Sequence, residues 1–277
     1  MIDSFDLSSA RSTFEHDGFI FVPHLFSHET LDKLETSIVR IARKYLGLES
    51  VELPDSVRRS ADGRVLFRFM EHARPDLFYK LNLHAGTSLE AMAVVAGTAV
   101  RSVLNAIVPA HQQPLFPQPL AFFYNHRSAP RLQYDWHQES SSFVDIENGY
   151  HLWFPLFGDI QSENGPMLLA RGSHKERLPF KVHAKAGHLT QWRLNRDIGK
   201  DFEIVECNMP RGHAVIFHHN TVHCTGENSA GLPRVSGIVR YLDCMTAAAF
   251  RPLVEFTYTA HSHEQEQARL SATNEDG

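Results

Sequence analysis

The chain has 277 residues, of which 43% are hydrophobic and 21% charged, and its formal net charge is −5. This composition is ordinary for a globular protein, and the acidic balance lacks the basic surface that nucleic-acid binding requires. Three scattered cysteines exclude a disulfide framework, no apolar run has the length of a membrane span, and the first residues do not form a secretion signal. We therefore expect a cytoplasmic protein without a nucleic-acid or membrane partner, folded as a single domain over residues 1–260 with a polar C-terminal tail at 261–277.

Helices are predicted to dominate the N-terminal part of the chain. Residues 18–22 form a short β-type run that Pro23 ends. Ser27 can then cap a helix that runs to about Gly47, with apolar residues at helical spacing at Leu31, Leu34, Ile38, Ile41 and Tyr45. A second, Ala- and Val-rich helix is predicted over residues 88–107. Residues 50–75 are densely charged and without a clear period, which is typical of a solvated loop, with a lid over a binding site as the alternative.

From residue 120 onward, short β-type runs alternate with turns. The turns carry the residues expected of them, for example Asn164-Gly165-Pro166 and Arg171-Gly172-Ser173. Regular short strands of this kind predict a β-rich core in the form of a sandwich or barrel. The predicted strands cover residues 120–124, 151–157, 167–170, 214–217 and 235–242.

A histidine and a carboxylate, His137 and Glu139, lie two positions apart in a segment that reads as extended. Residues at i and i+2 of an extended segment point to the same face, so both can bind one metal, and His223 on a distant strand-like run can supply the third ligand. Two histidines and one carboxylate suit non-haem Fe(II). The i, i+4 pair His219 and His223 is the alternative, a helical zinc site, but residues 214–217 beside it read as a strand.

Several motifs, taken together and in order, resemble the phytanoyl-CoA dioxygenase family of Fe(II)/2-oxoglutarate oxygenases. The resemblance implies a β-rich α+β protein with a double-stranded β-helix, a jelly-roll or cupin-like core, flanked by N-terminal helices. The motifs are EHDGF at 15–19, HQE at 137–139, WFPL at 153–156, ENGPM at 163–167, GSHK at 172–175, His223 and Arg234.

The same resemblance assigns roles to individual residues. His137, Glu139 and His223 would bind the iron and so carry catalysis, and Arg234 would hold the distal carboxylate of 2-oxoglutarate, which a guanidinium can grip through two parallel hydrogen bonds. Some relatives place a basic residue on the strand before the ligand pair, and here Tyr124, Asn125 or Gln133 can take that place. Trp153 would line the co-substrate pocket, with plain core packing as the alternative. The residues expected to contact 2-oxoglutarate are Arg234, Ser236, Thr225, Trp153, Gln133 and Tyr124.

Glu139 is a departure from the family, in which Asp is usual at this position. It retains a carboxylate, whereas halogenating relatives lack one there, so it argues against halogenation and for hydroxylation or a related two-electron oxidation. The implied reaction hydroxylates an unactivated C–H bond of a small molecule, consumes O2 and converts 2-oxoglutarate into succinate and CO2. The alternatives are desaturation, cyclisation or oxidative cleavage at the same metal, or a cupin-like binding protein without catalysis.

The sequence does not identify the substrate. Arg240 shares a strand face with Arg234 and can either contact substrate or form a structural ion pair. A homodimer also stays open. Basic residues that can meet an anionic group of the substrate are Arg58, Arg59, Arg64, Arg68 and Arg127.

Overall fold

The computed structural model describes residues 6–48, 54–58, 62–141, 148–183 and 191–243, so the predicted tail at 261–277 and the end of the predicted domain lie outside it. The helices, in chain order, are α1 (Leu7–Asp17), α2 (His28–Leu48), α3 (Asp55–Arg58), α4 (Gly63–Ala73), α5 (Pro75–Gly86), α6 (Leu89–Val95), α7 (Thr98–Ile107) and α8 (Ile198–Asp201). The strands are β1 (Phe19–Val22), β2 (Leu115–Pro117), β3 (Ala121–Asn125), β4 (Gly149–Leu156), β5 (Met167–Ala170), β6 (Phe180–His183), β7 (Gln191–Leu194), β8 (Ile204–Glu206), β9 (Ala214–His218), β10 (His223–Thr225) and β11 (Arg234–Asp243).

The main sheet is antiparallel and is built around β11. Its strand order is β1-β9-β4-β11-β2, and β3 also pairs with β11. β11 pairs with β4 along one side, from Val235 opposite Leu156 to Leu242 opposite Gly149, and with β3 and β2 along the other. Because β11 is hydrogen-bonded on both sides, its side chains are held at fixed positions on the two faces of the sheet.

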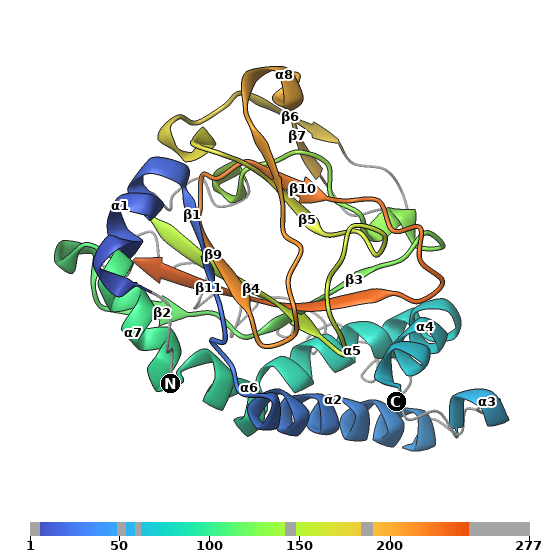
Figure 1. The fold of residues 1–277 in the computed structure, drawn as a ribbon. Coiled ribbons are helices and arrows are strands. Elements are labelled where there is room, and N and C mark those ends of the chain that lie inside the picture. Colours follow the sequence, from blue (N-terminus) through green and yellow to red (C-terminus); the bar gives the residue numbers. More distant parts are fainter. Residues whose placement is uncertain (1–5, 49–53, 59–61, 142–147, 184–190, 244–277) are drawn as a thin grey trace, which may run out of the picture.

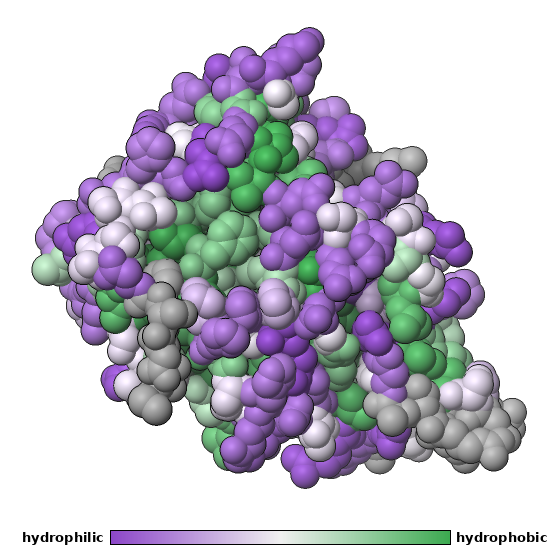
Figure 2. Space-filling view, in the orientation of Figure 1, coloured by the Kyte–Doolittle hydropathy of each residue, from purple (hydrophilic) through white to green (hydrophobic). Residues whose placement is uncertain are grey.

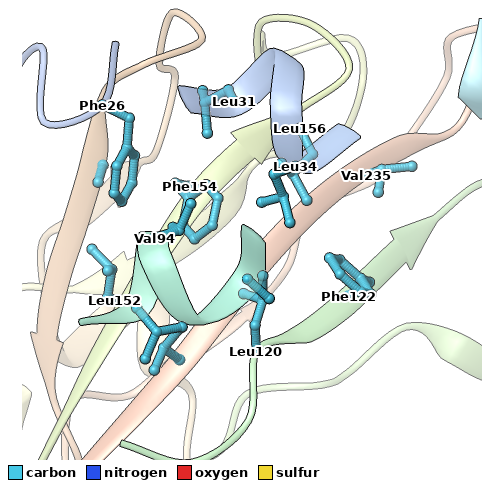
Figure 3. Close-up of a cluster of buried hydrophobic side chains, with 14 of the residues drawn as sticks. Phe26, Leu31, Leu34, Val94, Leu120, Phe122, Leu152, Phe154, Leu156 and Val235 are labelled. Carbon is cyan, nitrogen blue, oxygen red and sulfur yellow. The ribbon is translucent and has the colours of Figure 1, made fainter. Parts of the chain in front are cut away.

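Alternation along the strands separates the two faces. On β11, Val235, Val239 and Tyr241 belong to a large apolar cluster that includes the N-terminal helices. Ile238 belongs instead to a second cluster on the opposite face. Helices α2, α5 and α6 run along the first face in Figure 1, and Figure 3 shows the packing there. The labelled side chains of that core are Phe26, Leu31, Leu34, Val94, Leu120, Phe122, Leu152, Phe154, Leu156 and Val235.

Helix α2 confirms the helix predicted after Ser27, with a small shift in its buried stripe. Leu31, Leu34 and Ile38 are fully buried as the spacing indicated. Further along, Ala42 and Leu46 are the buried positions, while Ile41 and Tyr45 are only partly buried.

The prediction of a loop over residues 50–75 is wrong, because this region contains α3 and α4. Asp62 caps α4 by accepting a hydrogen bond from the backbone N–H of Arg64 at 2.9 Å. Leu66, Phe67 and Met70 then face the core. The high charge density concealed this stripe, which is short and lies among arginines.

The segment predicted as one helix over residues 88–107 is two helices, α6 and α7, interrupted at Ala96 and Gly97. By length and hydropathy alone, Leu89–Ile107 also qualifies as a membrane span, so the expectation that no such run exists was wrong. In the structure Val94, Val103 and Ile107 are buried in the core cluster, as expected of helices packed against a sheet.

A second sheet, β10-β5-β8, faces the main sheet. Met167 and Leu169 of β5 join Trp153 and Phe217 of the main sheet in one buried cluster. All strand pairs are antiparallel, which confirms the α+β class, and each predicted strand is present to within a few residues. Figure 2 shows hydrophilic side chains over most of the face that Figure 1 presents, with hydrophobic ones visible between them near its middle.

Substitution of Phe154 tests how much the core between the helices and the main sheet contributes to stability. Its side chain is fully buried and lies 4.8 Å from the ring of Phe26, centroid to centroid. Phe154→Ala should lower the free energy of unfolding by about 3–5 kcal/mol, since it removes buried apolar contact and leaves a cavity. Leu89→Ala is the control, because Leu89 is 86% exposed and its loss should cost under about 0.5 kcal/mol. Urea denaturation followed by circular dichroism measures both, and equal effects would contradict this description of the core.

Candidate metal centre

Three side chains with metal-binding atoms meet between the two sheets. One ligand atom from each of His137, Glu139 and His223 can be chosen so that all lie within 4.8 Å of one another. Nε2 of His223 is 3.9 Å from Oε1 of Glu139. All three residues are buried. Among the described residues this is the group of His, Cys, Asp and Glu side chains with metal-binding geometry.

Backbone pairing brings the two histidines together. The N–H of His137 donates to the carbonyl of His223 at 3.0 Å, and the N–H of His223 donates back at 3.0 Å. This is a hydrogen-bonded antiparallel pair, whose side chains lie on one face, and the ring centroids are 4.2 Å apart. The predicted extended segment reduces to this isolated bridge, because Glu139 begins a 3-10 helix, Glu139–Ser141.

The second nitrogen of each ring fixes its tautomer. Nδ1 of His137 lies 2.7 Å from the carbonyl oxygen of Asp135, and Nδ1 of His223 lies 2.9 Å from that of Thr221. A carbonyl only accepts, so each Nδ1 carries the proton and each Nε2 keeps its lone pair for a metal. Burial lowers the pKa of both rings, that of His223 to about 3, which keeps them neutral as metal binding requires.

Glu139 completes the donor set as a carboxylate. Burial is the largest influence on Glu139 and opposes its ionisation. The charge interactions that favour the anion, led by that with Arg240, together outweigh burial and hold the pKa of Glu139 well below its ordinary value. Nη2 of Arg240 donates to Oε1 of Glu139 at 3.0 Å. Arg240 was predicted either to contact substrate or to form a structural ion pair, and the structure contains the ion pair. Two neutral imidazoles and one carboxylate fit Fe(II) and leave its remaining coordination positions open.

A cavity of about 230 Å³ adjoins the three ligands and lies between the two sheets. Its walls are mainly apolar and aromatic, with the polar groups gathered around the ligands and two arginines. The lining residues are Phe123, Tyr134, His137, Glu139, Trp153, Met167, His223, Cys224, Thr225, Arg234, Ile238 and Arg240.

Arg234 places a buried positive charge in this cavity. Its Nη1 donates to Oγ of Ser236 at 2.7 Å and its Nε to the carbonyl of Gly165 at 3.1 Å. Its guanidinium carbon lies 5.3 Å from the ring centroid of Trp153. Burial lowers the pKa of Arg234 to about 10, so the group remains cationic at neutral pH. No acidic side chain among the described residues pairs with it, which suits the binding of an anion.

The other residues predicted to contact a co-substrate divide by strand face. Thr225 and Trp153 line the cavity. Ser236 does not line it but accepts a hydrogen bond from Arg234, which does. Tyr124 does not line it, because Tyr124 is opposite Val235 on the helix-covered face of β11 and packs against Phe78. Its neighbour Phe123, which sequence reasoning missed, faces the cavity instead.

Gln133 and two of the basic residues predicted near the substrate also lie elsewhere. Nε2 of Gln133 donates to Oδ1 of Asn125 at 3.2 Å, and Gln133 is not part of the cavity lining. Arg64 pairs with Asp62, and Nη1 of Arg68 donates to a backbone carbonyl at 3.4 Å. Both arginines belong to α4 and do not line the cavity.

Of the other predicted basic residues, Arg127 is exposed and does not line the cavity. Arg59 and the side chain of Arg58 lie outside the described part of the chain.

His219 does not join the metal ligands, so the helical zinc alternative is not what the structure forms. Its Nδ1 lies 3.1 Å from Nε2 of His151, and the two rings are stacked. The residues before it form strand β9.

Removal of any ligand should abolish tight metal binding. His137→Ala, Glu139→Ala and His223→Ala should each weaken Fe(II) binding more than about 100-fold, because loss of an outer partner of a ligand alone costs about 10- to 100-fold. His111→Ala, which changes an exposed histidine, should have no effect. Anaerobic calorimetric titration measures the Fe(II) affinity of the three ligand variants and of the control, each relative to the unmodified protein. Tight binding by any of the three ligand variants would remove that residue from the metal site.

Comparison with known proteins places this geometry in context. Ectoine dioxygenase of Bordetella parapertussis is 21% identical over 245 residues, which is 83% of this chain and 73% of the relative. The solved non-heme monooxygenase ThoJ has a TM-score of 0.55 at 18% identity and covers 86% of this chain and 77% of its own.

A second solved structure is the non-heme alpha ketoglutarate dependent epimerase SnoN from nogalamycin biosynthesis, with a TM-score of 0.55, 16% identity, and coverage of 86% of this chain and 83% of its own. SnoN has also been solved with Fe3+, alpha ketoglutarate and nogalamycin RO. These structural matches establish a shared fold. The sequence profile of phytanoyl-CoA dioxygenase matches residues 14–236, most of the chain. The protein therefore belongs to the phytanoyl-CoA dioxygenase family, whose cofactors are Fe(II) and 2-oxoglutarate.

Proposed function

We propose that the protein is an Fe(II)/2-oxoglutarate-dependent hydroxylase of a small molecule. The observation that carries the proposal is that one cavity contains both the ligand triad and a buried arginine without an acidic partner among the described residues. The triad supplies the metal site, and Arg234 supplies a fixed positive charge for a dicarboxylic co-substrate. We also propose that the two facing antiparallel sheets form a double-stranded β-helix, as the family resemblance implies.

Arg234 is suited to hold the distal carboxylate of 2-oxoglutarate. Two of its nitrogens are held by Ser236 and Gly165, so the guanidinium is oriented before any ligand arrives. An oriented guanidinium loses little freedom when it binds a planar carboxylate. Thr225 and Trp153 also line the cavity, and the ring of Trp153 lies beside the guanidinium of Arg234.

When bound, Fe(II) and 2-oxoglutarate use O2 to hydroxylate a C–H bond, with one oxygen atom passing to the product and one to succinate as CO2 leaves. The protein's own residues position the reactants. His137, Glu139 and His223 would hold the metal, and the adjoining cavity would take co-substrate and substrate. Phe123, Met167 and Ile238 present apolar surface to the cavity and exclude water from it.

The cavity size supports a small substrate. Its volume is about 230 Å³, which co-substrate and substrate would share, and binding pockets for drug-sized ligands are about 300–1,000 Å³. The name of the Bordetella relative, ectoine dioxygenase, likewise supports a small-molecule substrate.

Arg234→Met tests the assigned co-substrate anchor. Loss of a charged hydrogen-bond partner should raise the dissociation constant for 2-oxoglutarate at least about tenfold, because hydrogen bonds to charged groups contribute about 1.5–3 kcal/mol. Anaerobic calorimetry on the Mn(II)-loaded protein measures this without a substrate. Arg64→Met, which changes an arginine outside the cavity, is the control. Equal affinity in Arg234→Met and the unmodified protein would refute the assignment.

The reaction outcome is tested separately by product mass. SnoN is named as an epimerase, so the shared fold is compatible with more than one outcome. Incubation of the Fe(II)-loaded protein with 2-oxoglutarate, O2 and a panel of small metabolites should yield succinate and a product heavier than its substrate by one oxygen atom. A product that has lost two hydrogens would indicate desaturation or ring closure, and one of unchanged mass would indicate epimerisation.

A further inference from the structure

The metal-binding carboxylate of Glu139 has a second partner inside the protein. Oε1 of Glu139 accepts a hydrogen bond from Nη2 of Arg240 at 3.0 Å, while it lies 3.9 Å from Nε2 of His223. The side chains of Glu139 and Arg240 are 8% and 16% exposed. This is a buried, charge-assisted hydrogen bond directly beside the position of the metal.

Arg240 is well placed to fix the position of another side chain. It lies on the central strand β11, opposite His151 of β4, and its carbonyl accepts from the N–H of Gln118 at 2.8 Å. Its backbone is therefore held on both sides. Its side chain projects into the same cavity as Arg234, six positions earlier on the same face.

Glu139 needs such a partner, because a glutamate side chain has more rotatable bonds than an aspartate and begins here from a short 3-10 helix rather than from a strand. We propose that Arg240 is a positioning residue of the metal centre. Its guanidinium holds Glu139 in the conformation in which the carboxylate faces the two histidines. The two arginines of the cavity thus have separate roles, since Arg234 contacts no metal ligand and is left for an anion.

This inference rests on the metal centre but not on the proposed reaction, so it is tested by metal binding without co-substrate. Arg240→Met should weaken Fe(II) binding to the apoprotein about 10- to 100-fold, the range seen when an outer partner of a metal ligand is lost. Removal of a nearby positive charge by itself would favour a cation. Because Arg240 also keeps the pKa of Glu139 low, the titration is run at two pH values. A loss of affinity that persists at the higher pH is explained by lost positioning and not by protonation of Glu139.

Arg211→Met is the matched control. Arg211 forms a similarly buried ion pair with Glu35, with Nε and Oε1 2.9 Å apart and exposures of 13% and 14%, but it lies away from the cavity. Its loss should lower thermal stability and leave the Fe(II) dissociation constant within about twofold. Arg240→Lys, which retains the positive charge on a single donor nitrogen, should weaken binding less than Arg240→Met does.

A double-mutant comparison tests whether Arg240 acts on Fe(II) binding through Glu139. In a Glu139→Asp background the shorter side chain no longer reaches Arg240, so Arg240→Met should add less than about a threefold further loss. The absorption spectrum of bound Co(II) should also change in Arg240→Met and remain unchanged in Arg211→Met. An Fe(II) affinity in Arg240→Met that equals or exceeds that of the unmodified protein would overturn the proposal. If Arg240→Met does not fold, Arg240→Gln, which is shorter and uncharged, decides in its place, and unmodified affinity there would overturn the proposal equally.

Discussion

The site depends on one backbone interaction, the pair of reciprocal hydrogen bonds between His137 and His223. It joins a segment without regular structure to β10 and places two imidazoles on one face with their centroids 4.2 Å apart. The carbonyls of Asp135 and Thr221 then set both tautomers. Main-chain geometry therefore prepares two of the three ligands before any metal arrives, and this preorganisation reduces the cost of binding.

The third ligand and the proposed co-substrate anchor, Arg234, depend on charge rather than on backbone pairing. A carboxylate and two arginines share a cavity whose other walls are largely apolar. Glu139 is stabilised as an anion by Arg240, whereas Arg234 is oriented by a hydroxyl and a carbonyl and has no acid beside it among the described residues. In a low-dielectric cavity, a cation without a nearby anion costs free energy because it has lost its hydration. An anionic ligand that pairs with the cation relieves this cost and therefore binds more tightly.

The part of this site that could be predicted is the part that obeys strand alternation. Arg234, Ser236 and Arg240 share a face because they are separated by even numbers of residues on one strand. Tyr124 was misassigned because its face depends on how β3 pairs with β11, and a shift of one residue exchanges Tyr124 for Phe123. Pairing register between distant strands is a tertiary property, so a local pattern does not contain it.

The prediction of the fold is limited in the same way, because local sequence patterns contain little tertiary information. Helix α2 was predictable because its apolar stripe is long, while α4 was hidden by its arginines and α6 and α7 by their continuous apolar composition. The bond between Arg240 and Glu139 joins residues 101 positions apart and gave no local signal beyond charge.

The central claim is that one buried cavity binds Fe(II) and 2-oxoglutarate together. The most direct measurement is the visible absorption of the anaerobic protein after addition of Fe(II) and then 2-oxoglutarate. A 2-oxo acid chelated to Fe(II) produces a charge-transfer band. We predict that this band appears with both components at a stoichiometry of about one per chain, since the triad leaves the coordination positions that a chelate needs. A protein that binds Fe(II) but develops no band at saturating 2-oxoglutarate would contradict the account.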